Sequence, residues 1–222
     1  MESSLSLRKT FFLSIIVVFI GAGPAVASIA ELAQNANIFM YPKPHQISDL
    51  VLKGTSGQVV SLSNFRGRVV LLHFWSINCP ACRVEEPMLH RVKQMFGPSG
   101  LEVLAVNLVD PPTAVAHHAV TNRTPFPVLF DGGGGFDLKV VSMAGKKTAF
   151  VVNPRKEAIL EVPGFPTTYI VDVRGNAVGY SVGPARWDNA NAQALIQRLV
   201  SESKPIGMPG THPNGVMRVP AR

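Results

Sequence analysis

The sequence has very few cysteines, because Cys79 and Cys82 are the only two among 222 residues. One pair excludes a scaffold of several disulfides and a four-cysteine metal site. No histidines follow the pair at the Cys-x-x-Cys and His-x-x-x-His spacing of a zinc site. A purely structural disulfide across two intervening residues would close a very small loop and restrict the unfolded chain little. A chemical role therefore explains this pair better than a structural one.

Long apolar runs are also scarce. The one that comes nearest to the ~20 residues of a membrane span covers residues 11–20. Arg8 and Lys9 precede it, and the small residues Ala25 and Ala27 follow it at the spacing of a cleavage site. We expect residues 1–27 to be a removed signal peptide, with an uncleaved anchor as the alternative. Either form places the domain in an oxidising compartment such as the periplasm.

Charge is sparse as well: 16% of the residues are charged, and the net charge of +7 is spread along the chain. No basic block is dense enough to indicate nucleic-acid binding. The length that remains after the signal suits one domain, which we place at residues 41–200. Repeated proline and glycine over residues 201–222 predict a disordered tail.

The apolar pattern predicts an α/β fold with a mixed sheet flanked by helices. Continuous apolar runs at 69–75 and 101–108 are typical of buried strands. Helical spacing follows each of them, and a third helix is expected at about 187–200. Turn-rich segments indicate hairpins within 50–62 and between 167–171 and 177–181. Strands that alternate with helices predict a sheet covered by helices.

The cysteines stand where the first buried strand gives way to a helix. This position puts Cys79 at a helix N-terminus, where free N–H groups and the helix dipole favour a thiolate. Pro80 suits the first helical turn because its missing N–H costs little there. Cys82 lies one turn later and can attack a mixed disulfide on Cys79. The predicted chemistry is thiol–disulfide exchange.

Several motifs in combination resemble the thioredoxin superfamily, and specifically its exported TlpA/ResA-like branch, which includes the cytochrome c maturation thioredoxins. The resemblance covers about residues 41–200. The matching motifs are, in order, Gly57-x4-Leu62-Ser63-x-Phe65-x-Gly67, Phe74-Trp75-x3-Cys79-Pro80-x-Cys82, Glu85-x-Pro87, and Gly164-Phe165-Pro166-Thr167-Thr168-Tyr169-x-Val171-Asp172.

The resemblance implies a thioredoxin-like fold and a substrate site around the cysteines. Pro166 matches the family's cis-proline, beside which the backbone at Phe165 would pair with an extended substrate segment. A trans proline at the start of an edge strand is the alternative. The remaining implied substrate contacts are Trp75, Pro80 and Thr167, and Trp75 would shield the disulfide or simply pack.

Three further residues near the cysteines, Glu85, Glu86 and His73, have open roles. Glu85 falls where the family often has an acid, which would accept a proton from Cys82 or tune both thiol pKa values. The alternative is a solvated helix charge, and Glu86 is a weaker candidate for the same role. His73 lies in a buried strand and is expected to be a hydrogen-bonded core histidine rather than a ligand.

The sequence departs from the family pattern between Gly132 and Pro163. This segment is longer by roughly twenty residues than in relatives, where a short helix leads to the cis-proline. An inserted strand or hairpin beside the active site would alter the choice of partner. The other interpretation is an outlying loop.

The resemblance implies a monomeric reductase of disulfides in exported proteins, such as apocytochromes c or copper-handling proteins. Its electrons would come from a DsbD/CcdA-type membrane partner, with no cofactor or metal beyond the cysteine pair. Alternatives are a dithiol oxidase and a copper-binding module built on Cys79, Cys82 and a histidine. A thiol peroxidase is disfavoured, because the Thr-x-x-Cys context of that class is absent at Asn78-Cys79.

Overall fold

The structure is a computed structural model that describes residues 27–131, 137–143, 146–155 and 157–202. Nearly all of the predicted signal peptide and most of the predicted tail lie outside the described residues. Among the described residues, no helix combines the length and the apolar character needed to cross a bilayer.

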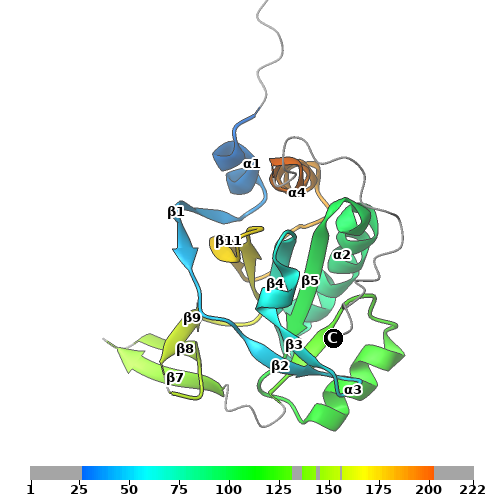
Figure 1. The fold of residues 1–222 in the computed structure, drawn as a ribbon, viewed down its shortest axis with the longest axis vertical. Helices are drawn as coiled ribbons and strands as arrows, with labels where there is room; N and C mark the ends of the chain where they lie inside the picture. Colours follow the sequence, from blue (N-terminus) through cyan, green and yellow to red (C-terminus); the bar gives the residue numbers. More distant parts are fainter. Residues whose placement is uncertain (1–26, 132–136, 144–145, 156, 203–222) are drawn as a thin grey trace, which may run out of the picture.

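The core of the fold is an eight-stranded mixed sheet with the order β1-β11-β10-β4-β5-β6-β2-β3 (Figure 1). β4 runs parallel to β5, and β5 runs parallel to β6, whereas the other neighbours are antiparallel. All residues of β4 and β5 are buried, as their continuous apolar runs predict. The strands are β1 (Phe39–Gln46), β2 (Val51–Gly54), β3 (Val59–Ser61), β4 (Val69–Phe74), β5 (Leu101–Val106), β6 (Val128–Phe130), β10 (Thr167–Val171) and β11 (Asn176–Val182).

Helices cover one face of this sheet. Buried residues of all four helices join one apolar cluster with β4 and β5, and α1 lies beside α4 (Figure 1). The cluster contains Cys79 and Cys82, so the predicted reactive pair sits on the helical side of the sheet. The helices are α1 (Ile29–Asn35), α2 (Pro80–Phe96), α3 (Pro112–Thr121) and α4 (Ala190–Glu202), with short 3₁₀ turns at Leu62–Phe65 and Gly97–Ser99.

A small antiparallel sheet contributes to the opposite face. It has the order β7-β8-β9 and is formed by β7 (Asp137–Met143), β8 (Lys146–Val152) and β9 (Ala158–Val162). Val151, Leu160 and Val162 are buried in a second apolar cluster with residues of β4, β5 and β10. The hydroxyl of Tyr169 in β10 also donates a hydrogen bond to the Glu161 carbonyl, at 2.7 Å. The segment that precedes Pro166 therefore packs on the main sheet.

Some elements differ from the sequence prediction. α1 and the start of β1 precede residue 41, and α1 joins the core through Leu32 and Ala33. α4 begins at Ala190 rather than near 187, and Trp187 lies before the helix with its side chain fully buried.

Candidate active site

Cys79 and Cys82 form a disulfide at the N-terminus of α2, with their Cα atoms 5.2 Å apart. Cys79 is the N-cap residue, and its sulfur accepts a hydrogen bond from the Cys82 backbone N–H at 3.0 Å. The first turn contains Pro80 and no acidic residue. No carboxylate in that turn therefore weakens the stabilisation of a negative charge on Cys79 by the helix dipole. Only 9% of Cys79 and 3% of Cys82 are exposed. This environment favours a thiolate on Cys79.

The loop that leads to the cysteines is fixed by the neighbouring strand connection. Asp110, which follows β5, accepts hydrogen bonds from the Ile77 backbone N–H and from the Asn107 side chain, each at 2.8 Å. Asn107 is fully buried and accepts bonds from the backbone N–H groups of Val109 and Asp110. Two connections at the same end of the sheet therefore hold one another in place.

The predicted substrate-binding residues lie around this end of the sheet. The peptide bond between Phe165 and Pro166 is cis. Thr167 pairs with Phe74 at the end of β4, so the turn at Pro166 lies beside the start of the cysteine loop. Phe165 packs against the apolar cluster that contains both cysteines. Thr167 is fully buried and donates a hydrogen bond to the Gly164 carbonyl at 2.6 Å, whereas Pro80 is exposed.

Glu85 has no exposed surface, so its interpretation as a solvated helix charge is wrong. Its Oε1 accepts a hydrogen bond from the indole N–H of Trp187. Burial raises the pKa of Glu85 to about 7, although hydrogen bonds from Trp187 and the Ala185 backbone oppose the rise. A carboxyl group with this pKa changes protonation near neutral pH, one turn after Cys82.

His73 lies in β4 with only 3% of its surface exposed, and its Nδ1 is 2.9 Å from the Thr168 hydroxyl. Burial lowers its pKa to about 3. The structure therefore places it as a hydrogen-bonded core histidine, as predicted. Among the described residues, no three His, Cys, Asp or Glu side chains are grouped so that they could hold a metal ion.

Sequence reasoning missed the partners that other elements supply. Trp187, which binds Glu85, is 102 residues away along the chain, and no local signal connects them. His118 of α3 contacts Glu86 at 3.2 Å and lies against Trp75 with ring centroids 4.7 Å apart. A spacing signal did exist for Glu86, because a residue four positions after Cys82 shares its helix face.

The fold, the disulfide at the start of α2 and the neighbouring proline turn define a thioredoxin-like thiol–disulfide oxidoreductase. Residues 44–177 match the AhpC/TSA family, and the chain belongs to that family.

Two curated relatives agree with this class. The chain is 26% identical over 160 residues to the thiol-disulfide oxidoreductase ResA of Bacillus subtilis, which covers 69% of this chain and 89% of ResA. It is 31% identical over 141 residues to the thioredoxin-like protein YneN of the same organism, which covers 62% of this chain and 70% of YneN.

A solved structure agrees as well. A crystal structure from Chlorobium tepidum, described as a thiol:disulfide interchange protein DsbE, superposes with a TM-score of 0.55 at 26% identity. That match covers 71% of this chain and 97% of the other. The protein is an oxidoreductase that acts on disulfides, and its similarity to these relatives implies disulfide-bearing protein substrates.

Proposed function

We propose that the protein reduces disulfides of selected exported proteins in the periplasm, with apocytochromes c or copper-handling proteins as the substrate class. The proposal rests above all on the Cys79–Cys82 disulfide, whose first sulfur caps the α2 N-terminus. The likeness to ResA, a thiol-disulfide oxidoreductase, supports this chemistry. A DsbD/CcdA-type membrane protein would supply the electrons that reduce the Cys79–Cys82 disulfide again.

In the proposed reaction the Cys79 thiolate attacks one sulfur of the substrate disulfide, and the other substrate sulfur leaves as a thiolate. Cys82 then attacks the Cys79 sulfur of the mixed disulfide, and the second substrate sulfur leaves. The two electrons of the Cys79–Cys82 dithiol thereby pass to the substrate. Glu85, buried one turn after Cys82, tunes the pKa of the two thiols.

The substrate segment would bind at the turn formed by Phe165 and Pro166. This turn lies beside the end of β4, and Phe165 contacts the cluster that includes both sulfurs. An extended segment that pairs with the backbone there would bring its own cysteine to Cys79. Trp75, which is only 6% exposed and packs in the same apolar cluster as the two cysteines, would shield the pair from water.

Thiol trapping in the native compartment tests the direction of electron flow. Cells are quenched with acid, free thiols are alkylated, and the alkylated sulfurs at Cys79 and Cys82 are counted. A reductase with its own electron supply is expected to be mostly reduced. A mostly oxidised pair would contradict the proposal and favour a dithiol oxidase.

Cysteine variants test the chemistry itself. Cys79→Ser should abolish reduction of insulin disulfides, because no other cysteine can replace the nucleophile. Cys82→Ser should retain attack but accumulate the mixed disulfide with substrate, which identifies the substrate by mass spectrometry. Unchanged insulin reduction by Cys79→Ser would contradict the whole mechanism.

A further inference from the structure

An open pocket of about 540 Å³ lies at the edge of the main sheet, between α1, the start of β1 and the end of β11. Ala30 of α1, Phe39 of β1 and Val182 of β11 are among the apolar residues that form its walls, and we call it the α1 pocket. Its volume falls in the range of about 300–1,000 Å³ that is usual for ligand sites. None of the described residues that line it is charged. The α1 pocket therefore suits a neutral, apolar group.

The α1 pocket opens because β1 does not extend along the last residue of β11. The pairing of the two strands begins at Phe39, opposite Tyr180, so no residue of β1 lies opposite Val182. Asn37, which precedes β1, has a φ of 60°, and this left-handed conformation turns the chain at the end of α1. Its backbone N–H donates to the Gln34 carbonyl at 3.1 Å rather than to β11. The end of β11 therefore borders the α1 pocket instead of another strand.

The backbone of Val182 points into this gap. Gly183 donates a hydrogen bond from its backbone N–H to the Pro166 carbonyl at 2.8 Å, so these two residues form a hydrogen-bonded pair of antiparallel backbone. Hydrogen-bonded and non-hydrogen-bonded pairs alternate along such strands, so Val182, opposite Thr167, directs its N–H and C=O away from β10. An unpaired strand edge of this kind is a template for an extended peptide.

The side chains add an apolar anchor and a polar group without a partner. Phe39 is 51% exposed and contacts the ring of Tyr180, with the centroids 5.2 Å apart. Val182 is 42% exposed, so both apolar side chains would lose solvent contact if the pocket were filled. Ser181 is only 3% exposed, and its hydroxyl has no hydrogen-bond partner among the described residues. Exposed aromatic anchors and unpaired buried hydroxyls are both features of a surface that binds a partner.

The α1 pocket lies at the same end of the sheet as the disulfide. Val182 is opposite Thr167, and Thr167 is opposite Phe74, the last residue of β4. Neighbouring strands are about 4.8 Å apart, so β11 lies about 10 Å from the strand that leads to Cys79. An extended peptide advances by about 3.3 Å per residue. A substrate whose cysteine meets Cys79 would therefore reach the α1 pocket about three to five residues further along.

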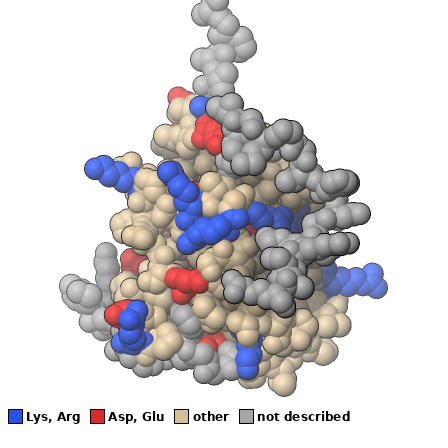
Figure 2. All heavy atoms as spheres, in the orientation of Figure 1, with Lys and Arg blue, Asp and Glu red and all other residues tan. Residues whose placement is uncertain are grey.

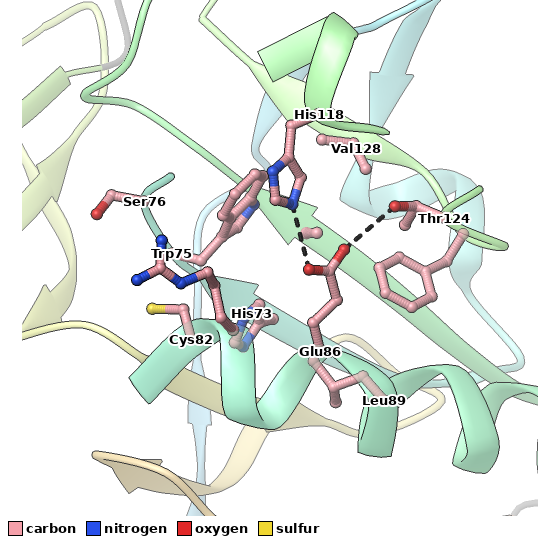
Figure 3. Close-up of a pocket in the computed structure, with 12 residues that line it drawn as sticks. His73, Trp75, Ser76, Cys82, Glu86, Leu89, His118, Thr124 and Val128 are labelled. Carbon is pink, nitrogen blue, oxygen red and sulfur yellow. Dashed lines mark hydrogen bonds and ion pairs between the residues drawn. The ribbon is translucent and has the colours of Figure 1, made fainter. Parts of the chain in front are cut away.

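The pockets around α2 and α3 are less suited to an apolar side chain. The pocket beside Cys82, shown in Figure 3, holds about 20 Å³, which is room for about one water. The Glu86 carboxylate that lines it is paired, with Oε2 3.2 Å from His118 Nε2 and Oε1 3.3 Å from the Thr124 hydroxyl (Figure 3). Two further pockets between these helices are lined by Arg83 and His118. Their polar lining favours polar groups.

We propose that the α1 pocket binds an extended segment of the substrate protein and receives an apolar side chain about three to five residues from the substrate cysteine. The inference rests on the proposed function, in which Cys79 attacks that cysteine. The backbone of the segment pairs with the free N–H and C=O of Val182, and its apolar side chain packs on Phe39. The α1 pocket thereby selects substrates by the sequence near their cysteine, which the disulfide alone does not read.

Attack on activated peptides measures this contact. Short glycine/serine peptides carry one cysteine, joined as a disulfide to thionitrobenzoate, and a single leucine at a varied position. In Cys82→Ser the Cys79 thiolate bonds to the peptide sulfur, and thionitrobenzoate leaves as a coloured thiolate, so absorbance gives the second-order rate constant. A leucine about three to five residues from the cysteine should raise this rate constant about 10-fold over the peptide without leucine. A leucine next to the cysteine should not.

Variants of the pocket in the Cys82→Ser background should remove this advantage. Ala30→Trp fills the pocket from an exposed position on α1, and Phe39→Ala removes its aromatic anchor, so either should return the leucine peptide to the rate of the peptide without leucine. Both should attack that peptide, and oxidised glutathione, which is too short to reach the pocket, at unchanged rates. Val59→Ala, at an exposed residue of the opposite edge strand β3, is the matched control and should keep the full advantage.

Equal rates for all peptides, or a leucine advantage that Ala30→Trp or Phe39→Ala retains, would overturn the proposal. A dimer in analytical ultracentrifugation that dissociates in Phe39→Ala would overturn it as well, because the α1 pocket would then bind a second copy of the chain. Absence of thionitrobenzoate release with every peptide would instead contradict the proposed function.

Discussion

At the scale of single residues, Glu85 makes the free energy of unfolding depend on pH. Its pKa is raised from 4.5 to about 7 in the folded protein, so the folded state binds more protons than the unfolded state between these values. Its contribution to the free energy of unfolding is therefore fully present below pH 4.5 and falls as pH rises to about 7. The loss amounts to about 3 kcal/mol at most.

Urea unfolding of the oxidised protein at pH 5 and pH 8 measures this effect. Between pH 5 and pH 8 the wild-type protein should lose up to about 3 kcal/mol more of its free energy of unfolding than Glu85→Gln loses. His73, whose pKa is lowered to about 3, acts in the opposite direction below pH 6.5, but it is present in both proteins and cancels in the comparison. An identical pH dependence in both proteins would contradict the assignment.

The residues of the site differ in how far the sequence predicts them. Cys79, Pro80 and Cys82 form a local motif, so their relation to the helix follows from spacing alone. The state of Glu85 depends on Trp187, which the fold brings from another element. No pattern within a helix reports such a partner, and this is why a solvated charge and a buried acid could not be distinguished from the sequence.

At the scale of elements, Asp110 links the loop after β5 to the cysteine loop. Asp110→Ala removes the bonds to Ile77 and Asn107 and should lower the free energy of unfolding by about 1–3 kcal/mol. The Ile77 amide should also exchange its hydrogen faster. Asp49→Ala is a matched control, because Asp49 accepts two bonds from Ser61 and Ser63 at the β2–β3 hairpin. It should cost a similar amount and leave exchange at Ile77 unchanged.

The small sheet should stabilise the domain without taking part in the chemistry. Leu160 is 6% exposed and packs in the second apolar cluster, so Leu160→Ala should lower the free energy of unfolding by about 2–4 kcal/mol. Val59→Ala, at a residue that is 65% exposed, should change it by less than about 0.5 kcal/mol. Chemical denaturation measures both. A loss of glutathione reduction by folded Leu160→Ala would instead give the small sheet a role in the active site.

Elements differ in predictability for a physical reason. β4 and β5 are buried on both faces, so each is visible in the sequence as a continuous apolar run. β1 has no such apolar run, because six of its eight residues are exposed and it contains two prolines. The sequence left two interpretations open for the segment before Pro166, an inserted strand or hairpin and an outlying loop. The packing of this segment depends on contacts of Val151 and Leu160 with distant strands.

At the scale of the whole molecule, Lys and Arg side chains form no single patch on the face drawn in Figure 2. Lys and Arg side chains are spread over several parts of the face drawn in Figure 2, with Asp and Glu among them. That face therefore offers no general electrostatic attraction for a substrate of one charge. The redox direction is likewise a property of the whole molecule, because it depends on which state of the pair the fold stabilises.

A thermodynamic cycle connects that direction to folding. The oxidised and the reduced protein differ in their free energy of unfolding. That difference is set by how far folding changes the reduction potential of the cysteine pair, at about 1.4 kcal/mol for each 30 mV. A reductase has a fold that favours its disulfide, so the oxidised form should be more stable, by about 1–3 kcal/mol. Urea unfolding of both forms at pH 7, with the reduced form kept in excess dithiol, measures the difference. A more stable reduced form would identify a fold that favours the dithiol, as in a strong dithiol oxidase, and would contradict the proposed reductase even if Cys79 and Cys82 exchange disulfides rapidly.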